Sequence, residues 1–144
     1  MKYQVGRQGR MIVAKFDDGD DVLKGLVDIA KKEDIRAGVL YVVGGMKKGD
    51  IVVGPEDESL PPVPVWKSLD ESHEVVGIGT IFWQDDEPKI HFHGAFGKKD
   101  MMKIGCLRKN SEAFLVLEVI IMEIEGVDAK RVLDPEVGLA LLKL

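Results

Sequence analysis

Short apolar runs separated by turn residues predict that this chain is built mainly from β-strands. Residues 11–16 form the first run, and the acidic and glycine residues at 17–20 end it. Residues 37–43 are almost uninterruptedly apolar, which is typical of a central strand covered on both faces, and Gly44 and Gly45 end this run. The pattern therefore predicts a sheet with a buried strand near its middle.

One segment between these runs has the spacing of a helix. Its apolar residues recur every three or four positions, and they are Val22, Leu23, Leu26, Ile29 and Ala30. Asp20 or Asp21 can accept hydrogen bonds from the free amides of the first turn. We therefore expect a helix that ends near Glu33 and packs against the sheet.

The middle of the chain reads as further strands and one surface loop. Residues 50–54 form a short strand, and residues 55–64 hold acids and four prolines, which cannot donate hydrogen bonds to a sheet. Residues 65–69 fit an edge strand. Residues 73–83 form a longer strand, and the turn at 85–88 leads into the next strand as a hairpin.

The last third of the chain holds one more apolar segment and a tail. Residues 113–124 fit a strand or a helix, and the alternation of Leu115, Leu117 and Val119 favours the strand. Residues 131–139 end in a short apolar stretch that we expect to dock on the body of the protein. No repeat or second domain is visible, so residues 1–144 are expected to form one domain.

The segment at 89–97 carries two of the three histidines, and the single cysteine follows at 106. Side chains alternate between the faces of a strand, so His91 and His93 are predicted to share one face. Two imidazoles and a thiolate are good zinc ligands, so His91, His93 and Cys106 are candidate metal ligands. Half-buried strand histidines and a small packed cysteine explain the same pattern, and the residues alone leave both interpretations open.

Two other polar residues are interpreted as structural. His73 precedes an apolar strand, which suits a surface position, and it is not expected to be a ligand. Glu118 interrupts an apolar strand, where an unpaired carboxylate would be costly. It should face water or meet a cation such as Arg131.

The composition limits the classes of function. The chain has 144 residues, of which 45% are hydrophobic and 31% charged, as in a soluble domain with its own core. The formal charge of −5 argues against unaided binding of nucleic acid, which needs clustered lysines and arginines. One cysteine forms no intrachain disulfide, and the first residues lack the apolar stretch of a secretion signal, so we expect a cytoplasmic protein.

Several segments together resemble one known family. They are Gly19-Asp20-Asp21-Val22, Ile90-His91-Phe92-His93-Gly94-Ala95-Phe96-Gly97 and Leu117-Glu118-Val119-Ile120-Ile121. In amino-acid sequence, order and spacing, these segments are similar to those of the PPC domain (plant and prokaryote conserved, DUF296). The resemblance covers about residues 11–142.

The resemblance implies an α+β fold, with a mainly antiparallel sheet flanked by helices, and assembly as a homotrimer. It also implies a metal site, because a family histidine at the position of Cys106 can join the two earlier histidines. The cysteine departs from that pattern but remains a good zinc ligand. The cupin barrel is a weaker match, since Gly97 and Lys98 stand where its pattern expects a glutamate.

Two functional hypotheses follow from these observations. The first is a trimeric, non-enzymatic binding module with a metal site, associated with DNA or gene regulation as the resemblance implies. The second is a zinc-dependent hydrolase or lyase in which His91, His93 and Cys106 leave one position of the ion open for water. Arg7 and Arg10 are faintly similar to the arginine hooks that plant relatives insert into DNA, but the proline of that motif is missing.

Overall fold

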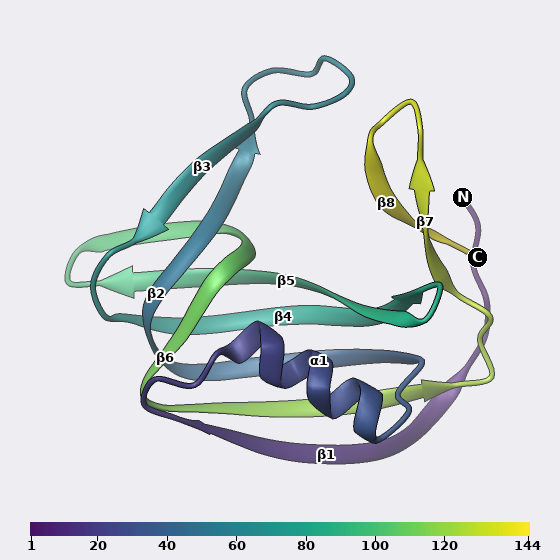
Figure 1. Ribbon diagram of the computed structural model, residues 1–144, viewed down its shortest axis with the longest axis horizontal. Helices are drawn as coiled ribbons and strands as arrows, with labels where there is room; N and C mark the ends of the chain where they lie inside the picture. Colours follow the sequence, from purple (N-terminus) through teal and green to yellow (C-terminus); the bar gives the residue numbers. More distant parts are fainter.

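The computed structural model describes residues 1–144 and shows a strongly curved sheet with one helix against it (Figure 1). The elements in chain order are β1 (Arg7–Asp17), α1 (Val22–Lys32), β2 (Ala37–Pro55), β3 (Pro64–Leu69), β4 (His73–Gln84), β5 (Glu87–Lys98), β6 (Met101–Glu125), β7 (Lys130–Asp134) and β8 (Leu139–Lys143). Six strands form the main sheet in the order β1-β6-β5-β4-β2-β3, and β7 pairs with β8. All pairings are antiparallel, which confirms the predicted kind of sheet.

The prediction that several helices flank the sheet is wrong. The single helix α1 covers one face, and no other segment is helical. The remaining apolar runs either alternate with polar residues or are rich in β-branched residues, and both patterns suit strands better than helices. The fold is therefore mostly β.

The predicted helix is confirmed, and its first turn is held by two side chains. Asp21 is the N-cap, and its Oδ1 accepts hydrogen bonds from Lys24 N at 3.1 Å and from Ser111 Oγ at 2.7 Å. The same Ser111 hydroxyl accepts a bond from Leu23 N at 2.9 Å. Ser111 lies on β6, so this network fixes the start of α1 to the sheet.

An Asp21→Ala variant should lower the free energy of unfolding by about 1–2 kcal/mol, because it removes the N-cap and leaves Ser111 without its acceptor. Urea denaturation followed by circular dichroism measures this change. Asp86→Ala in the turn between β4 and β5 is the matched control. Equal stability of the two variants would contradict this role of Asp21.

The two longest strands close the sheet on itself. β2 pairs with β4 and β6, and β5 joins β4 to the first part of β6, so these four strands form a ring. Contrary to prediction, β2 does not end at Gly44 but bends there. Gly44 has a φ of +136°, and a Cβ on it would lie 2.5 Å from Val116 O, so glycine permits the close approach of β6.

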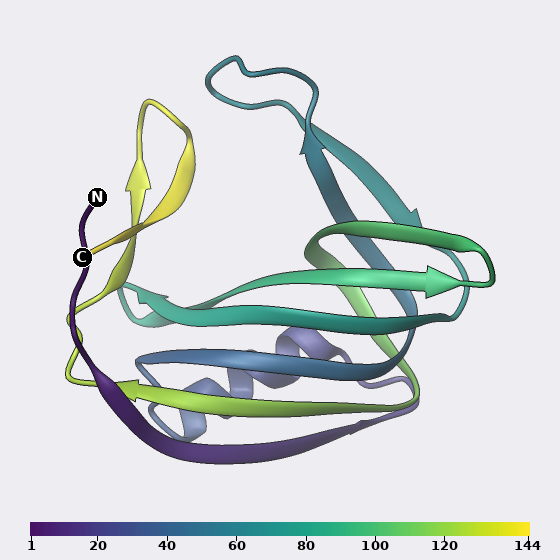
Figure 2. The ribbon, with the colours of Figure 1, turned by 180° about the vertical axis from the view of Figure 1, so that it is seen from behind.

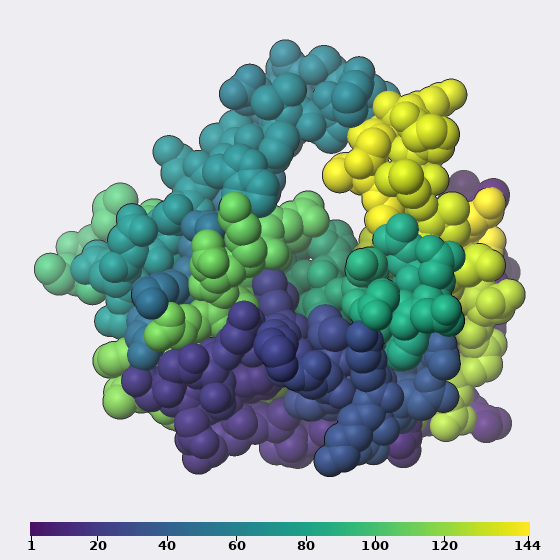
Figure 3. Space-filling model, viewed as in Figure 1, coloured from purple at the N-terminus to yellow at the C-terminus, as the bar shows by residue number.

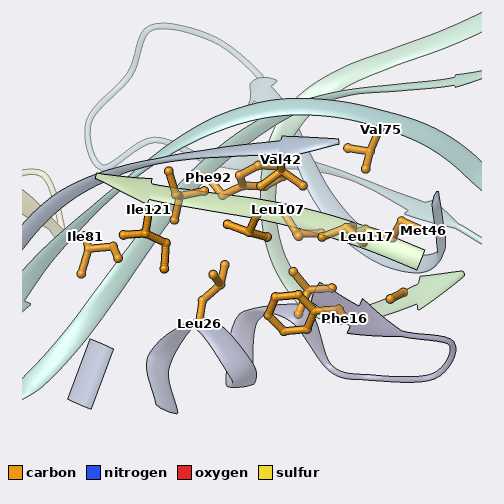
Figure 4. Close-up of a cluster of buried hydrophobic side chains, with 14 of the residues drawn as sticks. Phe16, Leu26, Val42, Met46, Val75, Ile81, Phe92, Leu107, Leu117 and Ile121 are labelled. Atoms are coloured by element: carbon orange, nitrogen blue, oxygen red, sulfur yellow. The ribbon is translucent and has the colours of Figure 1, made fainter. Parts of the chain in front are cut away.

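The core lies between α1 and the sheet and continues inside the ring (Figure 4). Leu26 of α1 faces strand residues such as Leu117 and Ile121, and all three are almost fully buried. The aromatic rings of Phe92 and Phe96 pack edge to face with centroids 6.5 Å apart. Phe92 lies between His91 and His93, so its burial turns both histidines to the opposite face of β5.

The face of the sheet that lies away from α1 is apolar and uncovered (Figure 2). Residues 37–43 alternate, with Leu40 and Val42 buried and Tyr41 and Val43 about half exposed, so the prediction that both faces are covered is wrong for the single chain. One cross-strand row on this face joins Val13, Ile120, Tyr41 and Ile78, which are 79%, 41%, 45% and 51% exposed. We call this row the apolar face.

The other predicted elements are largely confirmed. β3 is an edge strand, β4 and β5 form the predicted hairpin, and residues 113–124 belong to β6. Leu115 departs from the alternation, since it has a positive φ of 56° and is exposed. The tail forms the hairpin of β7 and β8, which projects from the sheet (Figure 1). Its apolar end lies beside the loop before β3, because Leu139 shares the lining of one groove with Pro62 and Pro64.

The single helix α1 is not long and apolar enough to cross a lipid bilayer.

Candidate metal centre

The three predicted ligands meet on one side of the sheet. β5 and β6 are neighbours, and their register places His93 directly opposite Cys106. His91 lies two residues earlier on β5, so it presents its ring on the same face. One ligand atom from each of the three residues lies within 4.8 Å of the others.

The donor set fits zinc. In a tetrahedral zinc site with two nitrogen ligands and one sulfur ligand, these atoms lie about 3.4–3.6 Å apart. The Nε2 atoms of His91 and His93 are 3.0 Å apart, so small side-chain movements bring the cluster into that range. A metal held by these three residues would have one position left for a further ligand.

Burial differs across the cluster. Cys106 is only 4% exposed, His91 is half-buried and His93 is exposed. Burial raises the pKa of the Cys106 thiol, and the charges of Arg108 and Arg131 oppose that rise. Burial, together with the charges of Arg131, His93 and Arg108, lowers the pKa of His91 to about 4. His91 is therefore neutral at pH 7 and able to coordinate a metal.

Arg131 holds His91 from the side opposite the cluster. Its Nη2 donates to His91 Nδ1 at 3.2 Å and to Thr80 Oγ1 at 3.3 Å, while Nη1 donates to Ala140 O at 3.4 Å. A guanidinium only donates, so Nδ1 of His91 must accept, and the ring proton of neutral His91 is on Nε2. That proton can be donated to His93 Nε2. Coordination through Nε2 of neutral His91 would therefore require the ring proton to be on Nδ1, which would break the hydrogen bond from Arg131.

A groove opens beside the cluster, lined by the segment of residues 52–66, by β6 and by Leu139 of β8. Figure 3 shows a hollow between that segment, in teal, and the hairpin of β7 and β8, in yellow. It has a volume of about 650 Å³, and it includes His93, Cys106 and Arg108 among its lining residues. Its other walls are mostly apolar. The cluster therefore lies at the end of a space large enough for a small ligand.

A family model for the Plants and Prokaryotes Conserved (PCC) domain matches residues 3–125 of the chain. The chain belongs to this family. PCC and PPC are two abbreviations of the same family name, so the resemblance found in the sequence is confirmed. The match spans β1 through β6 and includes all three candidate ligands.

Three solved structures have the same fold as this PCC domain. Metal-containing protein AF0104 from Archaeoglobus fulgidus has a TM-score of 0.87 and 23% identity, over 100% of both chains. A PPC protein from Pyrococcus horikoshii has a TM-score of 0.86 and 24% identity, over 100% of this chain and 98% of its own. A protein from Ralstonia eutropha JMP134, provisionally described as DNA-binding, has a TM-score of 0.77 and 22% identity, over 92% of this chain and 90% of its own. No match was found among the curated proteins.

Two other polar residues of this PCC domain carried a prediction, and one of them lies differently. His73 is buried, not on the surface, and its Nδ1 lies 2.6 Å from Glu71 O, outside the cluster of candidate ligands. Glu118 faces water, which is one of its two predicted environments, and it forms no ion pair with Arg131. The sequence interpretation missed Arg108, although strand alternation from Cys106 places it on the same face of β6.

The imidazole of His91 should titrate with a midpoint near pH 4 in the metal-free protein. In the unfolded chain the same ring binds its proton near pH 6.5. The contribution of neutral His91 to the free energy of unfolding is therefore fully present above pH 6.5 and is lost as the pH falls towards 4. Arg131→Gln should raise the pKa of His91, because it removes a nearby positive charge. Proton NMR of the ring measures the midpoint, and Arg7→Gln is the control. A midpoint near 6.5 in the unaltered protein would contradict this prediction.

Proposed function

We propose that this PCC domain is a non-enzymatic binding module that assembles as a homotrimer and holds a metal ion at His91, His93 and Cys106. The observation that carries the proposal is the convergence of the three ligand atoms within 4.8 Å. Zinc fits the imidazole and thiolate donors. The similarity in fold to a protein described as metal-containing gives further support.

The proposal of a trimer rests on the apolar face and on the resemblance of the sequence to the PPC family, which implies a homotrimer. Val13, Tyr41 and Ile78 leave a continuous apolar row in water, whereas a protein that functions as a monomer rarely exposes large contiguous apolar surfaces. The register continues this row from Ile78 to His93, so the apolar face ends at the metal cluster. Assembly through this face would place the cluster beside the subunit contact.

We propose an association with DNA as the setting in which the module works, as the description of the Ralstonia eutropha protein suggests. The chain itself offers little for direct contact with phosphates. Its net charge is −5, and Arg7 and Arg10 pair with glutamates on β6 instead of forming a free basic arm. The association would therefore act through a basic partner chain.

A zinc-dependent hydrolase or lyase is the alternative, and the position left open by a three-residue ligand set favours it. Such an enzyme also needs a group that takes a proton from the metal-bound water. The groove beside the cluster has no aspartate or glutamate in its lining. This lack of a carboxylate base favours the binding module.

Elemental analysis paired with the mass of the native oligomer tests the proposal. We expect about one zinc ion per chain and the mass of a trimer. Cys106→Ser should lose the metal and keep the trimer. A protein that takes up no zinc would overturn the metal site, and a monomer would overturn the assembly.

A further inference from the structure

The groove beside the metal cluster combines apolar walls with a positive end. Its apolar lining includes Trp66, Pro62, Pro64 and Ile104. None of its 13 lining residues is an aspartate or glutamate, although the chain has 25 of them. Arg108, whose side chain is exposed, therefore has no carboxylate partner in the lining of the groove.

The arginines of the chain divide into two groups. Arg7, Arg10 and Arg36 each form an ion pair with a carboxylate. Arg108 and Arg131 form none, and they are the two arginines at the metal cluster. A guanidinium remains charged and presents five N–H donors in a plane, which matches a carboxylate. The chain thus keeps its unpaired guanidinium groups in one place.

We propose that this groove binds a small organic carboxylate, with the carboxylate on Arg108 and the apolar body against Trp66 and the prolines. The proposal rests on the binding-module function and names its class of ligand, but it does not require the metal. Arg108 lines the groove directly, whereas Arg131 lies beyond His91 and adds positive potential. The volume of about 650 Å³ is ample for a body of six to ten carbon atoms, roughly the size that such pockets enclose.

Hexanoate is a suitable probe, and calorimetric titration of the metal-free trimer measures its binding. Hexanoate should bind at least about tenfold more tightly than acetate, which lacks the apolar body, and hexylammonium, which lacks the negative charge. Fluorescence gives the location, because Trp66 lines the groove while Trp83 is held elsewhere by Ile35 O. Hexanoate should change the emission of the unaltered protein and not that of Trp66→Phe.

Arg108→Gln should weaken the binding of hexanoate about tenfold or more, because it removes a charge-assisted hydrogen bond. Arg7→Gln is the matched control, since Arg7 is exposed and paired with Glu125 outside the groove, and it should bind like the unaltered protein. Ile104→Glu is a second variant, which places a carboxylate in the wall and should also weaken binding. Ile104 is exposed, so this change should not unfold the chain.

Three results would overturn the carboxylate groove. They are the absence of saturable binding, equal affinity for hexanoate and inorganic phosphate, and unchanged affinity in Arg108→Gln. Zinc uptake is measured on the same preparations by competition with a chelator. A protein that takes up zinc and does not bind hexanoate refutes this inference alone. A protein that binds hexanoate and takes up no zinc supports the groove and refutes the proposed metal site.

Discussion

A His93→Ala variant is expected to bind zinc at least about a hundredfold more weakly than the unaltered protein. Changes to residues that only support a ligand weaken metal binding by about 10- to 100-fold, and the loss of a ligand should exceed that range. His93 is the most exposed of the three candidate ligands, so its loss should affect zinc affinity more than folding. The affinity is measured by competition with a chromogenic chelator.

His73→Gln is the matched control, because the chain has a third histidine that lies outside the cluster. This variant should bind zinc like the unaltered protein, even if its stability falls with the loss of the buried contact to Glu71 O. Unchanged zinc affinity in His93→Ala would refute the metal site. A fall in zinc affinity of equal size in both variants would show that the effect arises from folding.

If the proposed trimer forms through the apolar face, an Ile78→Glu variant is expected to convert it into monomers at micromolar concentration. Ile78 is 51% exposed in the single chain, so a glutamate there is solvated in the monomer. Burying that carboxylate against apolar side chains of another subunit costs several kcal/mol. We expect the dissociation constant to rise by at least about a hundredfold. Sedimentation velocity over a range of concentrations measures the change.

Val27→Glu is the control for this prediction. Val27 is partly buried on α1. This helix lies on the side of the sheet opposite the apolar face (Figure 2), and the Val27→Glu variant introduces the same charge as Ile78→Glu. The Val27→Glu variant should leave the proposed trimer intact. A trimer that persists in Ile78→Glu would show that the apolar face is not the contact between subunits.

Local patterns predicted the elements of this fold better than their extent. The spacing of Leu26 and Ala30 predicted α1, and the acids Asp20 and Asp21 predicted an N-cap at one of these two positions, because such signals act within one turn. The continuation of β2 through Gly44 was not predictable in that way. It depends on the close approach of β6, which is more than 70 residues away in the sequence.

In the candidate site, too, local sequence predicted some features, whereas contacts between distant parts of the chain determine the others. Alternation along a strand predicted that His91 and His93 share a face, and the structure confirms that they lie together with Cys106. The place of Arg131 was not predictable, because it depends on where the hairpin of β7 and β8 leaves the sheet. The exposure of Tyr41 was missed because an apolar run does not reveal whether another subunit covers one side of it.

The hydrogen bond from Arg131 to His91 would make the C-terminal hairpin compete with a metal ion at the proposed site. A ligand on Nε2 of His91 and a donor on Nδ1 act on opposite ends of one imidazole, and a neutral ring cannot accept at both. Thermodynamic linkage then requires reciprocity. A change that stabilises the contact between the hairpin and His91 weakens the affinity for the ion, and a bound ion weakens that contact by the same factor. The C-terminal hairpin would thus influence the ion concentration at which the proposed metal site fills.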